Sequence, residues 1–295
     1  MGSNGAQVAV DAPGGGFYYF GAGGIPAVSR WRHDVGFSLM GRVGKDLSVH
    51  LLIVMPVFNE QSTVGRVLDK VKRYCADILV VDDGSTDGTG RILGRRRDIH
   101  LIQHGRNLGY GRSLIDAFRW VDAHGYDWVI TMDCDEQHEP ESIPAFVREI
   151  ETERWDLISG SRYISPQREG DMPPTDRRAI NVEITDLVNT MFGLRITDAF
   201  CGFKAHRVSS TVKLRLDEAG YAFPVQLWPR VAKMGLRMME IPVRLIYKDP
   251  NRHFGGKLDD PGYRLKHYLG VLQAEWETFC TPWPDEPVAC CGRCP

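Results

Sequence analysis

From Ser48 onward the sequence alternates short apolar runs with amphipathic segments, and this alternation limits the fold more than any other feature. The apolar runs have the length of buried strands, and the segments between them have the periodicity of helices with one apolar face. The expected strands are 51–57, 78–81, 99–103, 128–132 and 157–160, and the expected helices are 64–74, 89–95, 113–124 and 141–151. Strands and helices in regular alternation indicate an α/β fold, in which a mostly parallel sheet carries helices on both faces.

The 295-residue chain divides into three parts by composition. Residues 1–46 contain eleven of the 31 glycines and show little periodicity, so we expect a flexible or loosely docked extension. The α/β domain then occupies residues 47–260. Residues 261–295 begin with an amphipathic helix, which either lies on a membrane or packs against the domain. They end in a tail rich in proline and cysteine (Cys280, Cys290, Cys291, Cys294), which is a zinc site, a site of reversible lipidation or a reduced, disordered segment.

The charges of the chain nearly cancel, with 36 Lys and Arg against 38 Asp and Glu. This balance provides no broad basic field for a phosphate backbone, which argues against nucleic acid as the main partner. No run approaches the roughly 18 consecutive apolar residues that suggest a membrane span. The N-terminus also lacks the charged and apolar regions of a secretion signal. We therefore expect a cytoplasmic location.

Charged or amide side chains follow every one of the expected strands. These strand ends are 59–60 (NE), 82–85 (DDGS), 106–107 (RN), 133–135 (DCD) and 161–162 (SR). In open α/β sheets, ligands bind in the crevice beyond the carboxyl ends of the strands. The sequence therefore predicts a binding site at this edge of the sheet, built from residues far apart in the chain.

Two carboxylates, Asp133 and Asp135, come directly after the expected strand 128–132, and Gln137 follows two residues later. Alternate residues leaving a strand point the same way, so both carboxylates can converge on one hard cation, with the Gln137 oxygen as a further ligand. A divalent cation there would neutralise charge on a departing nucleoside diphosphate. The competing interpretation is two solvated carboxylates in a turn.

The segment 82–89 (DDGSTDGT) combines glycines with small polar residues after a buried strand. Its composition suits a tight turn and the first turn of a helix, whose free backbone N–H groups attract anions. Asp87 fits a capping role. Asp83, at the strand end, could instead accept the N–H groups of a uracil or guanine base.

These segments together resemble a known family. The segments 56–60 (PVFNE), 81–89 (VDDGSTDGT), 107–111 (NLGYG) and 132–138 (MDCDEQH) are similar to the successive signatures of family 2 glycosyltransferases, which have the GT-A fold. The segments 160–163 (GSRY), 177–178 (RR), 197–204 (TDAFCGFK) and 252–257 (RHFGGK) resemble those of the polyprenyl-phosphate, or dolichol-phosphate, mannosyltransferases. The resemblance covers roughly residues 48–260.

The resemblance implies a role for each matching residue. Pro56, Phe58, Glu60 and Asp83 would hold the nucleotide base and ribose, and Asp133, Asp135 and Gln137 would hold Mg²⁺ or Mn²⁺ on the donor diphosphate. Arg162 and Arg178 would face the acceptor phosphate, because a guanidinium offers two parallel donors to phosphate oxygens. Arg252 and Lys257 would close over the diphosphate. Asp135, Asp198, Arg162 and Arg178 would lie at the reacting groups.

Asp198 matches an acidic position near the acceptor site of this family. In members that accept a sugar, a carboxylate deprotonates the attacking hydroxyl, whereas a phosphate acceptor is already ionised near neutral pH and needs no strong base. Asp198 would then position other groups. Four residues depart from the family pattern, namely Glu136, Glu139, Cys201 and Gln226, and they leave the sugar and the acceptor open.

The expected enzyme is a metal-dependent, inverting glycosyltransferase that moves a hexose, mannose or glucose, from a nucleotide sugar such as GDP-mannose or UDP-glucose to a polyprenyl phosphate. A lipid acceptor would be met peripherally, at the cytoplasmic face of the membrane. One alternative keeps the donor chemistry and replaces the acceptor by a soluble sugar or small metabolite. The other is a noncatalytic protein that binds sugar nucleotides.

Overall fold

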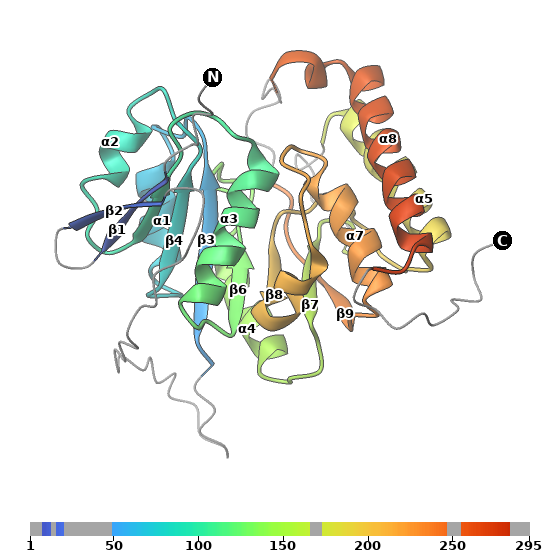
Figure 1. Cartoon of the computed structure of the whole chain (residues 1–295), viewed down its shortest axis with the longest axis horizontal. Coiled ribbons are helices and arrows are strands. Elements are labelled where there is room, and N and C mark those ends of the chain that lie inside the picture. Colours follow the sequence, from blue (N-terminus) through green and yellow to red (C-terminus); the bar gives the residue numbers. More distant parts are fainter. Residues whose placement is uncertain (1–7, 13–15, 21–48, 166–172, 247–254, 284–295) are drawn as a thin grey trace.

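A single twisted sheet of nine strands runs through the computed structural model, which describes residues 8–12, 16–20, 49–165, 173–246 and 255–283 (Figure 1). The strand order is β2-β1-β5-β4-β3-β6-β8-β7-β9. The strands are β1 (Val8–Ala12), β2 (Gly16–Phe20), β3 (Leu51–Val57), β4 (Ile78–Asp82), β5 (His100–Gln103), β6 (Trp128–Thr131), β7 (Leu157–Ser161), β8 (Lys204–Arg207) and β9 (Met238–Pro242).

The middle of the sheet is parallel. β3 pairs with β4 on one side and β6 on the other, in the registers Ile53↔Ile78 and Leu51↔Trp128, and β5 continues the parallel set beyond β4. β8 lies antiparallel between β6 and β7, and β9 pairs in parallel with β7. The carboxyl ends of β3, β4, β5 and β6 therefore share one edge, which is where the sequence predicts the binding site.

Helices cover both faces of the sheet. The α-helices are α1 (Val64–Val71), α2 (Thr89–Leu93), α3 (Tyr110–Ala123), α4 (Ile143–Ile150), α5 (Thr175–Phe192), α6 (Val208–Thr211), α7 (Phe223–Lys233) and α8 (Pro261–Cys280), and the 3-10 turns are η1 (Pro140–Ser142), η2 (Val212–Leu214) and η3 (Gly256–Asp259). α1 and α4 bury residues such as Leu68 and Phe146 against Ile53 and Met55 of β3. α3 packs on the opposite face, against Leu52 and Val54. Alternate residues of β3 thus feed two separate cores.

The expected α/β architecture is confirmed, since six of the seven strands from β3 to β9 run the same way. The five expected strands and four expected helices are all present, with ends displaced by at most a few residues. One strand of the main sheet, β8, is antiparallel and was not expected from the sequence. The expected extension 1–46 contains the hairpin β1–β2, which adds to the sheet edge at β5. The three-part division of the chain stays a prediction.

The C-terminal helix α8 packs against α5 and α7, beside the sheet (Figure 1). Tyr268 and Leu272 are buried there in a cluster with Trp228 of α7 and Ile184 of α5. Of the two expected roles of this helix, membrane contact and packing against the domain, the structure shows the packing. The expected cysteine site falls largely outside the described residues, which include Cys280 but not Cys290, Cys291 or Cys294.

A buried ion pair fixes α8 to α7. Both oxygens of Glu275 accept hydrogen bonds from Arg230, at 2.5 and 2.9 Å, and Oε1 also accepts one from Gln226 at 2.9 Å. Because a buried guanidinium that loses its partner carries a large desolvation cost, Glu275→Gln should lower the free energy of unfolding by about 3 kcal/mol. Urea unfolding measures this, with Glu277→Gln on the exposed side of the same helix as the control. Equal stability of the two variants would contradict the prediction.

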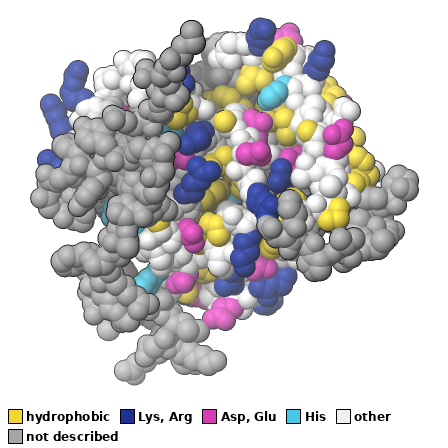
Figure 2. Space-filling view, viewed as in Figure 1, with side chains coloured by type: hydrophobic (Ala, Val, Ile, Leu, Met, Phe, Trp, Pro, Cys, Tyr) yellow, Lys and Arg dark blue, Asp and Glu magenta, His cyan; other side chains and the backbone are white. Residues whose placement is uncertain are grey.

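Acidic side chains lie among the basic ones on the face shown in Figure 2, so that face carries no large field of one sign. Within the part of the chain that the structure describes, no helix combines the length and the apolar character needed to cross a bilayer.

Candidate active site

The site begins where the central strands end side by side. The backbone N–H of Asp83 donates to the carbonyl of Val57 at 2.8 Å, which joins the ends of β4 and β3. The N–H of Met132 donates to the carbonyl of Val54 at 3.0 Å, which joins the end of β6 to the middle of β3. The strand order thus brings Asp83, the loop that begins at Phe58, and the acidic pair after β6 to one edge.

Asp83 is held by backbone and histidine donors. Its Oδ1 accepts from the N–H of Leu108 at 2.8 Å and lies 2.7 Å from Nδ1 of His104, and its Oδ2 accepts from the N–H of Gly109 at 2.9 Å. Gly109 has φ 108°, and an added Cβ would lie 2.3 Å from the carbonyl oxygen of Ala219, so only glycine fits. The carboxylate is buried and fixed in direction.

The other residues predicted at the base lie on the loop after β3. Phe58 is 40% exposed, whereas Glu60 is buried and accepts a hydrogen bond from Oγ1 of Thr63 at 2.6 Å. Pro56 lies in β3, opposite Val81 of β4. Between them, Oδ1 of Asn59 accepts from the N–H of Thr86 at 2.8 Å. Asn59 therefore joins this loop to the segment after β4. The ring of Phe58 stays exposed to solvent.

The acidic pair is set in place by its neighbours. The N–H of Gln137 donates to Oδ1 of Asp135 at 3.0 Å, which folds the turn after β6 back on itself. Burial and the negative charge of Asp133 raise the pKa of the Tyr110 hydroxyl well above its usual value, so Tyr110 stays a proton donor beside this carboxylate. Gly202 approaches both groups closely, since an added Cβ would lie 2.7 Å from Oδ2 of Asp133 and 2.9 Å from the Tyr110 oxygen.

Two carboxylates after β6, those of Asp133 and Asp135, could bind a metal ion. Among the described residues, no group of three or more His, Cys, Asp or Glu side chains is arranged to hold a metal. Asp133 and Asp135 are hard oxygen ligands suited to Mg²⁺ or Mn²⁺, and such ions usually complete their shell with water and phosphate oxygens. The residues present therefore fit a cation that is held jointly by the protein and by a bound diphosphate.

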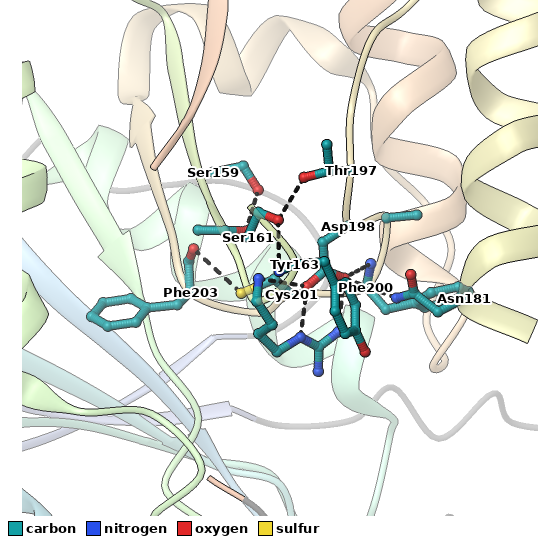
Figure 3. Close-up of polar contacts among 12 residues, drawn as sticks. Ser159, Ser161, Tyr163, Asn181, Thr197, Asp198, Phe200, Cys201 and Phe203 are labelled. Atoms are coloured by element: carbon teal, nitrogen blue, oxygen red, sulfur yellow. Dashed lines mark hydrogen bonds and ion pairs between the residues drawn. The ribbon is translucent and has the colours of Figure 1, made fainter. Parts of the chain in front are cut away.

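A second group of polar residues lies beyond β7, around a fully buried carboxylate (Figure 3). Oδ2 of Asp198 accepts from Nε of Arg162 at 2.6 Å, and Oδ1 accepts from Nη2 of Arg162 at 2.8 Å. This is the paired geometry that a guanidinium makes with a carboxylate. Burial alone would raise the pKa of Asp198, but the charge and hydrogen bonds of Arg162 outweigh it and lower that pKa to about 2.

Arg178 reaches the same carboxylate through Asn181. Oδ1 of Asp198 accepts from Nδ2 of Asn181 at 2.9 Å, and Oδ1 of Asn181 accepts from Nη1 of Arg178 at 3.3 Å. The Arg178 guanidinium also lies over the ring of Tyr163, 3.7 Å from its centroid, and the Arg162 guanidinium lies 5.6 Å from the same ring. Asp198, Asn181 and Tyr163 thus hold the two predicted phosphate-binding arginines together.

Exposed apolar side chains flank this pair of arginines. Ile164, two residues after Arg162, is 44% exposed. Val182, one helical turn after Arg178 on α5, is 41% exposed. Each of the two arginines therefore has an exposed apolar residue within four positions along the chain.

The remaining predicted cations lie near the start of α8. Lys257 is exposed in η3, with its ammonium 5.7 Å from the ring centroid of Tyr263. Arg264 of α8 donates to Asp176 in the first turn of α5 at 2.6 Å, so this segment is joined to the helix that carries Arg178. Arg252 lies outside the described residues.

Several residues of the site were missed by sequence reasoning. His104 and Asn181 were not singled out, although His104 directly follows β5 and Asn181 lies one turn after Arg178. Glu240 of β9 was also missed, and it accepts from the backbone N–H groups of Thr197 and Asp198 at 2.8 and 3.2 Å. Its sequence surroundings give no signal of this role.

Comparison of the sequence with known proteins identifies the family. Residues 52–215 match the family described as Glycosyl transferase family 2. An undecaprenyl-phosphate mannosyltransferase of Micrococcus luteus is 32% identical over 242 residues, which cover 78% of this chain and 97% of the relative. The chain is a family 2 glycosyltransferase. The resemblance expected from the sequence is thereby confirmed, and of the alternatives the noncatalytic binding protein is set aside.

One further relative by sequence and one solved structure are similar to this glycosyltransferase. A polyprenol monophosphomannose synthase of Mycolicibacterium smegmatis is 29% identical over 65% of this chain and 76% of the relative. Among solved structures, S. aureus TarS 1-349 in complex with UDP-GlcNAc superposes with a TM-score of 0.54, at 15% identity, over 77% of this chain and 66% of that one. This likeness concerns the fold, and it agrees with the GT-A architecture expected from the sequence.

The close approach of Gly202 to the acidic pair gives a prediction for this glycosyltransferase. Gly202→Ala should displace the Asp133 carboxylate and lower glycosyl transfer roughly 10- to 100-fold, because small misplacements at a reacting centre have effects of that size. Steady-state transfer rates measure it. Gly65→Ala is the matched control, since nothing lies within 4 Å of a Cβ at Gly65. A Gly202 variant as active as this control would show that the Asp133 position does not matter.

Proposed function

We propose that this enzyme transfers a hexose from a nucleoside diphosphate sugar to a polyprenyl phosphate, with Mg²⁺ or Mn²⁺ on the donor diphosphate. The single observation that carries the acceptor class is the pair Arg162 and Arg178, which share the ring of Tyr163 and each have an exposed apolar residue, Ile164 or Val182, nearby in the chain. A phosphate on a hydrocarbon chain is the ligand that uses both features. Support also comes from the relatives named as a polyprenyl-phosphate mannosyltransferase and a polyprenol monophosphomannose synthase.

The donor is proposed to lie along the ends of β3, β4 and β6. The base and ribose would contact Pro56, Phe58, Glu60 and Asp83, with the base stacked on the exposed ring of Phe58. The diphosphate would lie toward Asp133 and Asp135, with Gln137 as a further oxygen ligand to the cation. A divalent cation bound there supplies neutralising charge to the departing nucleoside diphosphate. Arg252 and Lys257 are proposed to cover the diphosphate from the segment before α8.

The acceptor phosphate is proposed to attack the anomeric carbon in line, with inversion. It is ionised near neutral pH and needs no general base. Asp198 fits this chemistry, because it is fully buried and already engaged by Arg162 and Asn181. We assign Asp198 a positioning role, in which it directs the two guanidinium groups toward the attacking oxygen. The lipid would be met by peripheral contact.

The test is transfer of labelled hexose into an organic-extractable product. GDP-mannose and UDP-glucose are offered separately, with Mg²⁺ or Mn²⁺, to a short polyprenyl phosphate and to the matching polyprenol that lacks the phosphate. We expect label only with the phosphate and only without a chelator. Release of nucleoside diphosphate with a soluble sugar, and no lipid label, would replace the lipid by a soluble acceptor. Transfer that persists in excess chelator would remove the metal from the proposal.

A further inference from the structure

His104 is a buried histidine that lies between two carboxylates. Its Nδ1 lies 2.7 Å from Oδ1 of Asp83, which follows β4, and its Nε2 lies 3.3 Å from Oδ2 of Asp116 on α3. Its side chain has no exposed area. An ionised carboxylate can only accept hydrogen bonds, and a neutral imidazole has one N–H and one lone pair. Nδ1 is within hydrogen-bond distance of Asp83, whereas Nε2 lies within ion-pair distance of Asp116 without making a hydrogen bond. A neutral imidazole would turn its lone pair toward one of the two carboxylates, so the arrangement favours the charged form.

The surrounding charges agree with this form. Burial alone would lower the pKa of His104, but the carboxylates of Asp116 and Asp83 outweigh it and raise that pKa to about 9. Asp116 also pairs with Arg112 at 2.6 Å and with Arg119 at 3.3 Å, both on α3. These four residues are the charged groups that face His104 directly or through Asp116. With His104 as an imidazolium, the cluster contains two carboxylates and three cationic groups.

The link to function runs through Asp83. One of its oxygens, Oδ2, accepts a single hydrogen bond, from the N–H of Gly109, and so keeps a lone pair for a further donor. Oδ1 is occupied by His104 and by the N–H of Leu108. A ligand donor that meets Asp83 therefore meets a carboxylate whose direction is set from the far side by the imidazolium.

We infer that His104 is a positioning residue for the nucleotide base: as an imidazolium it clamps Asp83 to α3 through Asp116 and aims the free lone pair of Asp83 at a base N–H group. This inference rests on the proposed function, in which Asp83 binds the base. It predicts that the charge of His104 acts on the nucleotide and not on the acceptor. Deprotonation at alkaline pH then weakens nucleotide binding.

The protonation state is measured directly, on the unmodified enzyme. Long-range ¹H–¹⁵N correlation spectra of the histidine rings at pH near neutral should show two N–H nitrogens for His104. His206 is an internal reference for the neutral form, because burial and the nearby Lys204 lower its pKa to about 3. Asp116→Asn should shift the titration of the His104 signal to lower pH. A neutral His104, or a titration that Asp116→Asn leaves unchanged, overturns the inference.

The functional arm compares binding of UDP and GDP, with Mg²⁺, by the wild type, His104→Gln and the exposed control His124→Gln. At neutral pH the dissociation constant of His104→Gln should be about tenfold higher or more, because a hydrogen bond from a charged group is lost. The acceptor KM and the control variant should stay near wild type. Since uracil and guanine also lose a proton in alkali, the readout is the ratio of variant to wild-type constants, which should approach one above pH about 9.

The outcomes separate the two proposals. If the wild type binds nucleotide and His104→Gln binds it equally well, only the role of His104 is overturned. If the wild type binds neither nucleotide, the proposed function itself fails. If His104→Gln does not fold, the spectra of the wild type and of Asp116→Asn decide whether the imidazolium is present. Asp116→Asn should then lose nucleotide affinity at lower pH than the wild type, and equal pH profiles would overturn the role of His104.

Discussion

Replacing Asp135 with asparagine should lower glycosyl transfer by about a thousandfold, with little change in stability. The substitution keeps the shape of the side chain and removes one of the two carboxylates that fit a divalent cation at the end of β6. Electrostatic stabilisation of a departing charge is a large part of catalysis, and loss of one such group commonly costs two to three orders of magnitude in rate. Asp135 is partly exposed, and asparagine keeps the side-chain oxygen that accepts a hydrogen bond from the Gln137 N–H, so we expect little change in stability.

The measurement is the rate of transfer with Mg²⁺ or Mn²⁺, together with the Mg²⁺ dependence of nucleotide binding. Glu141→Gln is the control, because Glu141 is an exposed carboxylate in the turn just before α4. We expect Asp135→Asn to lose the metal dependence of nucleotide binding and the control to keep it. Asp135→Asn with wild-type rates would leave the acidic pair without a role in the reaction.

Replacing Asp198 with asparagine should weaken both the fold and the acceptor site. The Arg162 guanidinium, with only 16% of its side chain exposed, would lose its paired carboxylate. Removing one partner of a buried ion pair typically costs 3–5 kcal/mol, and we expect an effect of about that size on unfolding. Since Asp198 also reaches Arg178 through Asn181, the KM for the lipid phosphate should rise roughly tenfold, while the donor KM stays near wild type.

The acid dependence of stability gives an independent readout. The pKa of Asp198 is lowered from 3.8 to about 2 in the folded chain, so its charge stabilises the fold above pH about 4. This contribution is lost as the pH falls from about 4 through about 2. Urea unfolding of the wild type should therefore lose stability in that window, and Asp198→Asn should lose less. Parallel pH profiles for the two chains would mean that Asp198 is not ionised in the fold.

The positions of the strand ends could be predicted well from the sequence, because each parallel strand is a short apolar run followed by polar residues. Asp83 and Asp133 each follow a continuous apolar run, and the strands carrying them flank β3. β8 gives no such signal. Its four residues are KAHR, yet Lys204 and His206 are 3% and 1% exposed. A strand of polar residues that is buried by its neighbours has no apolar pattern to detect, so its position between β6 and β7 had to come from the structure.

On the proposed acceptor side, the sequence indicates the two arginines but not the contacts that hold them. Arg162 and Arg178 are visible as cations after a strand and at the start of a helix. Asp198, which accepts hydrogen bonds from Arg162 and Asn181, is 36 residues from Arg162 and 17 residues from Asn181 along the chain. Such pairs depend on how α5 lies against β7, which local patterns do not encode. The same holds for His104, whose partner Asp83 is 21 residues away.

The segment from His104 to Tyr110 contacts both halves of the proposed donor site. Leu108 and Gly109 donate to Asp83, and Tyr110 stands beside Asp133. A substitution there that retunes the choice of base would also disturb the carboxylate proposed to hold the cation. Redesign of nucleotide preference therefore has little freedom in this segment. If Phe58 contacts the base as proposed, this exposed residue on the other loop would be the position at which a substitution changes the preferred base without disturbing the proposed cation site.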